Sequence, residues 1–145
     1  MKKIVMVSLL LVAGLAASAQ CDKELVEVAK SKITKNEVII NEFKVKLKKA
    51  DINDPAPVAK FSQKLEEGHK YRLRIESGKE ENRSEGILRI FENNKFLGTT
   101  YSQNSDTCYD SFVFKCQKTG EYKLLITFHN GKAGCAVVLV TEINE

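Results

Sequence analysis

Apolar and polar residues alternate along most of the chain. Phe43, Val45 and Leu47 are separated by lysines, which predicts a half-buried strand with a lysine-rich outer face, suited to the edge of a sheet. Similar short segments follow, and turn residues such as Gly68 separate them. The further predicted strands are residues 61–65, 71–75, 86–91, 95–101, 111–116, 121–128 and 135–141.

The same alternation predicts which side chains form the core. Tyr71, Leu73 and Ile75 should face inward, whereas Arg72 and Arg74 should face solvent. Two further inward rows are Phe112, Phe114, Cys116 and Tyr122, Leu124, Ile126. Because these aromatic residues occupy the alternate strand positions that face inward, we assign them to the core rather than to a ligand-binding surface.

The spacing of apolar residues near the N-terminus differs from the alternation of a strand. Within residues 22–33, apolar residues from Leu25 to Ile33 have a spacing compatible with one short amphipathic helix. Residues 50–57 combine two prolines with Asp and Asn residues and predict a loop.

Many short strands without intervening helical patterns indicate an all-β protein. We expect an antiparallel β-sandwich of jelly-roll or immunoglobulin-like type, with about seven or eight strands, over residues 42–145. A helical N-terminal leader should occupy residues 20–41.

Residues 1–19 have the three parts of a secretory signal peptide. Two lysines precede an apolar run too short to span a bilayer, and the segment ends in Ala-Ser-Ala. We therefore expect export to the periplasm or the exterior, with cleavage after Ala19 and no membrane-spanning segment in the remainder. Cys21 offers the alternative of a lipid anchor in the envelope, although Gln20 stands where lipoprotein signals normally hold a small residue.

Charge excludes some partner classes. Removing residues 1–19 leaves 126 of the 145 residues, enough for one domain with a core, with 21 basic against 19 acidic side chains. Because both signs are interspersed along the predicted strands, the sequence gives no electrostatic indication of nucleic acid or of an anionic membrane as a partner.

Four cysteines in an exported chain favour disulfides over metal binding. No C-x-x-C pair is present, and His69 and His129 lie far apart in the sequence, so we expect neither a zinc site nor a cofactor.

Strand geometry ranks the cysteine pairs. A strand rises about 3.3 Å per residue, which places Cys116 at the opposite end of the sandwich from Cys108 and Cys135, beyond the reach of a disulfide. Cys108 with Cys135 is therefore the first candidate pair. Cys21 and Cys116 would then pair or remain free.

Two segments resemble small secreted β-sandwich proteins of Gram-negative bacteria, most of them uncharacterised. They are Phe-Lys-Cys-Gln-Lys-Thr-Gly-Glu-Tyr at residues 114–122 and Gly-Cys-Ala-Val at residues 134–137. Since each segment holds a cysteine, the resemblance implies Cys116 with Cys135 as the alternative disulfide.

More distantly, residues 58–142 resemble the bacterial pre-peptidase C-terminal domain. The resemblance rests on an extended segment near Phe61, a Gly-x-x-Tyr at Gly68, a Leu-x-Ile-Phe strand at Leu88 and a later Thr-Gly-x-Tyr turn. It implies the sandwich fold and little about function, because such domains are usually non-catalytic appendages of secreted enzymes, whereas we expect no second domain here.

No catalytic arrangement outweighs a structural role for its residues. His69 and His129 each adjoin a predicted turn, and no serine has the glycine pattern of a nucleophile elbow. Glu66 and Glu67 are neighbours on a strand and point to opposite faces, so they cannot flank one glycosidic bond. Two loops offer oxygen ligands, but neither matches the twelve-residue calcium loop. They are the sets Asp51, Asn53, Asp54 and Asn104, Asp106, Asp110.

The leading expectation is a non-catalytic binding module that holds an unknown protein or glycan with its loops or an exposed sheet face. An exposed row including Arg72, Arg74 and Arg89 is a candidate contact surface. The alternative is a structural subunit of a cell-envelope assembly, joined by strand addition at residues 43–48. A small secreted hydrolase is the second alternative.

Overall fold

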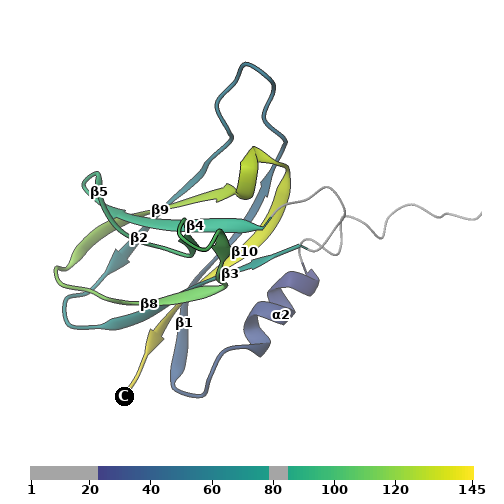
Figure 1. The fold of residues 1–145 in the computed structure, drawn as a ribbon. Helices are drawn as coiled ribbons and strands as arrows, with labels where there is room; N and C mark the ends of the chain where they lie inside the picture. The colour runs from purple at the N-terminus through teal and green to yellow at the C-terminus, as the bar shows by residue number, and fades with distance from the viewer. Residues whose placement is uncertain (1–22, 79–84) are drawn as a thin grey trace, which may run out of the picture.

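Two antiparallel sheets pack face to face, and one short helix lies against the outside of one of them (Figure 1). The computed structural model describes residues 23–78 and 85–145. The elements are α2 (Leu25–Ser31), β1 (Glu37–Leu47), β2 (Ala59–Leu65), β3 (Lys70–Ser77), β4 (Gly86–Glu92), β5 (Lys95–Thr99), β6 (Tyr101–Ser102), β7 (Thr107–Cys108), β8 (Ser111–Lys115), β9 (Gly120–Phe128), the 3-10 turn η2 (His129–Gly131) and β10 (Gly134–Ile143). The predicted all-β sandwich with one short helix is confirmed.

The sheets have the strand orders β1-β10-β3-β8 and β2-β9-β4-β5, and we call them the β1 sheet and the β2 sheet. Every neighbouring pair is antiparallel. This arrangement of eight strands in two sheets is a jelly roll, one of the two predicted types. β1 lies at a sheet edge, as its lysines predict, and it begins at Glu37, inside the segment expected to be the leader.

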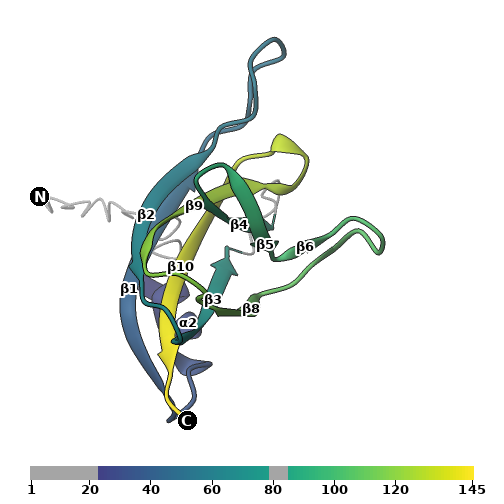
Figure 2. The same ribbon diagram turned by 90° about the vertical axis from the view of Figure 1, so that its left-hand side faces the viewer.

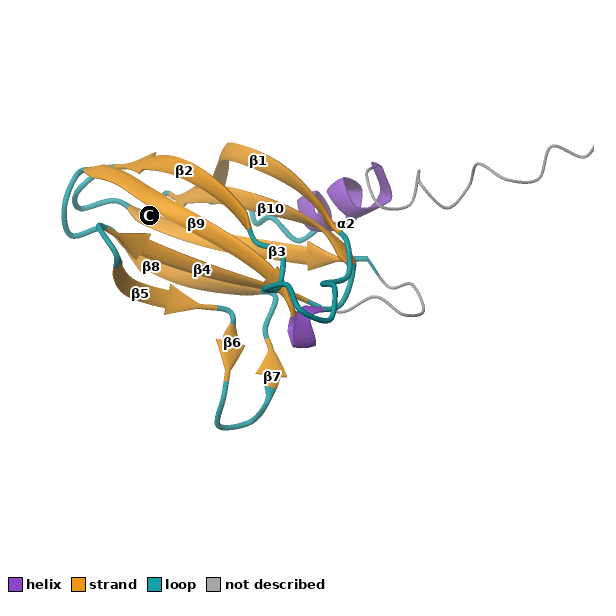
Figure 3. Cartoon of the chain, turned by 90° about the horizontal axis from the view of Figure 1, so that it is seen from above, coloured by secondary structure: helices purple, strands orange, loops and turns teal. Residues whose placement is uncertain are grey.

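β6 and β7 form a small hairpin that projects from the sandwich (Figures 2 and 3). The predicted strand over residues 95–101 is divided between β5 and β6, and β7 was not predicted. β7 has two residues, too few to produce a detectable alternation.

The predicted inward rows form the main core between the sheets. Tyr71, Leu73 and Ile75 are buried, and so are Tyr122, Leu124 and Ile126 opposite them. Cys116 is buried with them, and Phe112 and Phe114 pack against the cluster while remaining partly exposed.

β10 is buried on both faces, from Gly134 to Thr141. Ala136, Val138 and Val140 point into the main core. The alternate residues of the strand point outward into a second cluster beneath α2, which has Leu25 and Ala29 as its helical members. The outward-facing members from β10 are Cys135, Val137 and Leu139.

Two ion pairs hold α2 over β10 from the neighbouring strands. Lys30 Nζ lies 3.4 Å from Glu42 Oε1 on β1, and Lys32 Nζ donates to Glu76 Oε2 on β3 at 2.8 Å. The hydrogen bond to Glu76 raises the pKa of Lys32. The helix is thus attached to the strands on both sides of β10.

A buried carboxylate fixes the turn from α2 into β1. Glu37 accepts hydrogen bonds from the Thr34 backbone N–H at 2.7 Å and the Thr141 hydroxyl at 2.8 Å, and Arg72 Nη1 lies 3.4 Å away. Burial alone would raise the pKa of Glu37, but the hydrogen bonds from Thr34 and Thr141 and the charge of Arg72 hold this pKa below its usual range.

The prediction that Arg74 faces solvent is wrong. Arg74 lies on the outer parity of β3, but its exposed fraction is 6 % and its Nε atom has no hydrogen-bond partner among the described residues. The reason is that α2 packs on this face of the β1 sheet and contacts β3. The alternation of apolar and polar residues along β3 correctly places Arg74 outside the main core. It does not reveal that α2 forms a second layer over this face.

Both predicted disulfides are wrong. Cys108 and Cys116 are free thiols, whereas Cys135 is disulfide-bonded. Cys135 faces outward under α2, Cys116 faces the core on the other side of the same sheet, and Cys108 lies in the β6–β7 hairpin. Cys21 lies outside the described residues, as does the predicted signal peptide at residues 1–19.

Peptide mapping without reductant tests the state of these cysteines. In denatured, unreduced protein, iodoacetamide should alkylate Cys108 and Cys116 and leave Cys135 unmodified, because the Cys135 sulfur is in a disulfide. Reduction beforehand should make Cys135 reactive. A peptide that joins Cys135 to Cys108 or to Cys116 would contradict the structure.

Matched leucine variants test whether α2 covers the β1 sheet. Leu139 is fully buried under α2, whereas Leu125 lies partly exposed on the outer face of the other sheet. We expect Leu139→Ala to lower the free energy of unfolding by about 2–5 kcal/mol and Leu125→Ala by about 1 kcal/mol or less. Urea unfolding measures both, and equal losses would contradict the two-layer arrangement.

Candidate functional site

The outer face of the β2 sheet is the main candidate surface. Along β2 and β9, exposed side chains alternate with buried ones, and among the described elements α2 covers the other sheet. We call this surface the open face. Its members, read from the strand register, are Lys60, Ser62, Lys64, Arg89, Phe91, Phe96, Thr99, Glu121, Lys123 and Leu125.

Strand pairing brings these residues into rows that cross all four strands. One row places Ser62 beside Lys123, and Phe91 beside Phe96. The row next to it runs through Lys60, Leu125, Arg89 and Thr99. Residues from four separate parts of the sequence therefore share one continuous surface.

The open face is strongly basic. The open face carries four cationic side chains and one carboxylate, that of Glu121. The cations are Lys60, Lys64, Lys123 and Arg89. Lys123 Nζ lies 3.7 Å from Glu121 and donates to Ser62 Oγ at 2.5 Å. The face keeps a positive excess after this pairing, which favours an anionic partner.

A shallow hollow of about 340 Å³ lies where the open face meets the β6–β7 hairpin. Phe96, whose exposed fraction is 53 %, forms one wall and contacts Phe91 edge-on, with ring centroids 5.6 Å apart. Arg89 Nη1 donates to Thr127 Oγ1 at 2.9 Å. The other lining residues are Thr99, Tyr101, Gln103 and Asn104. A second hollow of about 350 Å³ is lined by Ser62, Lys64, Gly120 and Glu121.

The hairpin beside the first hollow is fixed to η2 through Asp106. The Tyr101 hydroxyl donates to Asp106 Oδ1 at 2.5 Å, and His129 Nε2 lies 2.9 Å from the same oxygen. These two hydrogen bonds, first that of Tyr101 and then that of His129, lower the pKa of Asp106. The Tyr101 side chain is thus held at the border of the hollow.

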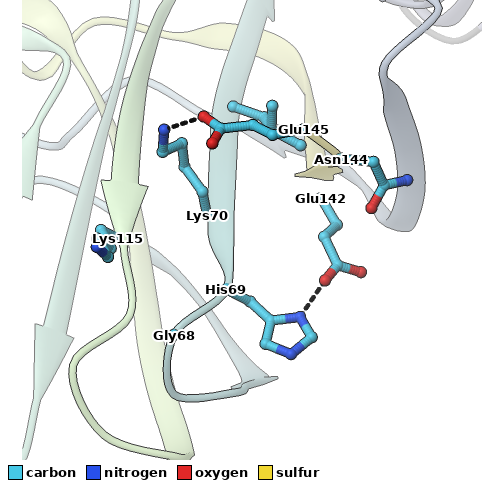
Figure 4. Close-up of a pocket in the computed structure, with 8 residues that line it drawn as sticks. Gly68, His69, Lys70, Lys115, Glu142, Asn144 and Glu145 are labelled. Carbon is cyan, nitrogen blue, oxygen red and sulfur yellow. Dashed lines mark hydrogen bonds and ion pairs between the residues drawn. The ribbon is translucent and has the colours of Figure 1, made fainter.

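A second candidate site surrounds His69 at the end of β10 (Figure 4). His69 Nδ1 contacts Glu142 and its Nε2 lies 3.4 Å from Glu66, while Lys70 contacts Glu145. The hydrogen bond that His69 donates to Glu142 raises the pKa of His69. Most charges here are satisfied by each other, and no serine, threonine or cysteine lines this pocket of about 380 Å³.

The three arginines expected in one exposed row are not brought together. Arg72 and Arg74 lie on the outer side of the β1 sheet, where Arg72 faces Glu37 and Arg74 is buried. Arg89 lies on the open face. Of the predicted contact residues, Arg89 therefore belongs to the candidate site.

The oxygen-bearing side chains of the second loop, which does not match a calcium loop, also lie apart. Asp106 contacts Tyr101 and His129, whereas the Asp110 carboxylate lies 3.3 Å from Lys32 on the α2 side. In the described ranges no group of three or more His, Cys, Asp or Glu side chains is arranged to hold a metal ion.

None of the helices in these ranges is long and apolar enough to cross a membrane.

Comparisons with known proteins add little. No family model matches the sequence, so none supports the resemblance to the pre-peptidase C-terminal domain, and no curated protein matches it. A similar solved structure is PliG of Aeromonas hydrophila, a periplasmic inhibitor of g-type lysozyme. The two chains are 9 % identical, the match covers 75 % of this chain and 87 % of PliG, and the TM-score is 0.47. We draw no functional conclusion from this likeness.

The raised pKa of His69 predicts a pH-dependent stability. Because this pKa is higher in the folded than in the unfolded state, its contribution is fully present below the unfolded value of about 6.5 and is lost as the pH rises through the folded value. The urea midpoint should therefore fall as the pH rises above about 6.5.

Two variants test whether the pair of His69 and Glu142 causes this pH dependence. His69→Gln and Glu142→Gln should each flatten that fall, because either change removes the interaction between the two side chains. An NMR titration that places the pKa of His69 at or below about 6.5 would contradict the geometry of the pair.

Proposed function

We propose that this protein is an exported, non-catalytic binding module that receives its partner on the open face. The observation that carries the proposal is the contrast between the two sheets. α2 covers the β10 and β3 part of the outer face of the β1 sheet, whereas the β2 sheet presents cations, a half-exposed phenylalanine and two hollows to solvent.

The residue types on the open face suit binding. Arginine and large aromatic residues contribute most where surfaces recognise partners, and Arg89, Phe96 and Tyr101 line one hollow together. They stand on paired strands and a braced hairpin, so little conformational entropy is lost when they engage a ligand.

A non-catalytic role is supported by the state of the candidate nucleophiles and bases. Burial raises the pKa of the Cys108 thiol, which disfavours the reactive thiolate. Cys116 lies in the core, where its thiol donates to the Lys118 carbonyl at 3.1 Å. His69 faces carboxylates on both ring nitrogens, and no serine, threonine or cysteine lines its pocket.

The disulfide at Cys135 supports export, since disulfides persist in oxidising compartments.

An assembly subunit joined at β1 is the second candidate. β1 is an edge strand, and Val38, Ile39 and Ile40 are exposed in succession near its start. Such an edge can accept a strand from a partner. Lys44 and Lys46 farther along β1 oppose pairing, which places this candidate below the open face.

A capture experiment tests the choice of surface. Immobilised oxidised protein is exposed to envelope extract, and the wild type is compared with the double variant Phe96→Ala/Lys123→Glu on the open face. The matched control is Tyr109→Ala/Lys115→Glu, in which the tyrosine has the same 53 % exposed fraction and the lysine lies on β8.

We expect saturable retention by the wild type and the control, with a loss of about tenfold or more in the open-face variant. Equal retention by the open-face variant would contradict the proposal. Loss of retention in Ile39→Lys instead would select assembly through β1.

A further inference from the structure

We propose that the ligand of the open face is an acidic polysaccharide, a chain of sugars that carry carboxylate or sulfate groups. This inference rests on the proposed function and adds the chemical class of the ligand. It follows from how charge, hydrogen-bonding groups and hollows are distributed over the face.

The cations are spread over the sheet rather than gathered at one point. Lys60 and Lys64 lie four residues apart on β2, Lys123 lies on β9, and Arg89 lies on β4. Neighbouring strands are about 4.8 Å apart, and alternate residues on a strand about 6.8 Å apart. A ligand with anionic groups repeated along a chain can meet such spaced charges one after another, whereas a single anion cannot.

The groups around the first hollow suit a sugar ring. Arg89 uses one N–H on Thr127, which leaves other guanidinium donors for carboxylate or sulfate oxygens. The Thr99 hydroxyl and the side-chain amides of Gln103 and Asn104 supply donors and acceptors for sugar hydroxyls. Phe96 offers an exposed apolar ring against which the C–H face of a sugar can pack.

The two hollows indicate a chain rather than a small molecule. One lies over β2 and β9 near Glu121, and the other lies between β4, β5 and the hairpin near Arg89. The row that holds Lys123 and Phe96 runs between them in the strand register. A ligand that fills both hollows therefore crosses a cation and an aromatic ring, whereas small-molecule sites are usually single and concave.

The composition of the face disfavours a protein partner. Lysine and serine are depleted at protein interfaces, whose centres are apolar. Here Lys123 and Ser62 occupy the row between the hollows, on strands β9 and β2, and Lys60 and Lys64 flank them. Exposed lysines are point charges well suited to anionic groups that vary in position along a polymer.

Polygalacturonate and its methyl ester provide a matched pair of probes, because they share a sugar backbone and differ in charge. Binding of the oxidised protein to each immobilised polymer is measured for the wild type and for Phe96→Ala, Arg89→Gln and Lys123→Gln. Controls off the open face are Tyr109→Ala and Lys115→Gln. Urea unfolding confirms that each variant is folded.

We expect the wild type to bind polygalacturonate at least about tenfold more tightly than the ester, and to weaken as NaCl rises from about 50 to about 300 mM. Phe96→Ala should weaken binding about five- to tenfold, and each charge variant about threefold, while both controls stay within about twofold of the wild type.

Three results would overturn the inference. They are equal binding of the two polymers, binding unaffected by Phe96→Ala, and tighter binding of a single-stranded oligonucleotide of equal charge. If neither polymer binds while the open-face variant still loses capture of envelope material, the binding module stands and the ligand belongs to another class, such as an acidic protein. If the double variant Phe96→Ala/Lys123→Glu keeps both the capture of envelope material and the binding of polymer, the proposed function itself fails.

Discussion

Burial of β10 on both of its faces is the constraint that organises this molecule. An unbroken apolar run on a central strand gives its sheet no polar outer side at that position, so the strand needs a second layer to exclude water. α2 supplies that layer, and the Lys30–Glu42 and Lys32–Glu76 ion pairs hold it from the strands on either side. Cys135 adds a covalent bond on the same face.

This constraint makes the two sheets unequal. The outer side of the β1 sheet becomes an interior that takes in even the guanidinium of Arg74, whereas the β2 sheet keeps the ordinary alternation with one side in solvent. This difference is why we propose the β2 sheet as the binding surface. Its positive charge arises from residues of β2, β4 and β9 that lie far apart in the sequence.

Alternation predicts the sandwich, the main core rows and the edge position of β1 because each depends on local periodicity and burial parity. It does not predict that α2 docks on β10. The continuous run from Cys135 to Val140 was the available signal, since a strand apolar on both parities is buried on both faces.

The candidate site is less accessible to sequence reasoning. Lys60, Lys123 and Arg89 look like separate solvated charges, and together with Lys64 they become one basic surface through the pairing of β9 with β2 and β4, which no local pattern specifies. The same holds for Phe96, which could be assigned to the core until the bulge between β4 and β5 is known.

Lysine acetylation followed by mass spectrometry tests the central claim most directly. The protein is labelled briefly, with and without the envelope material that it retains, and protection is compared lysine by lysine. Ligand on the open face should protect Lys60, Lys64 and Lys123 and leave Lys44, Lys46 and Lys115 unchanged. Protection confined to the latter group would show that the protein binds through the β1 sheet, and would contradict this account.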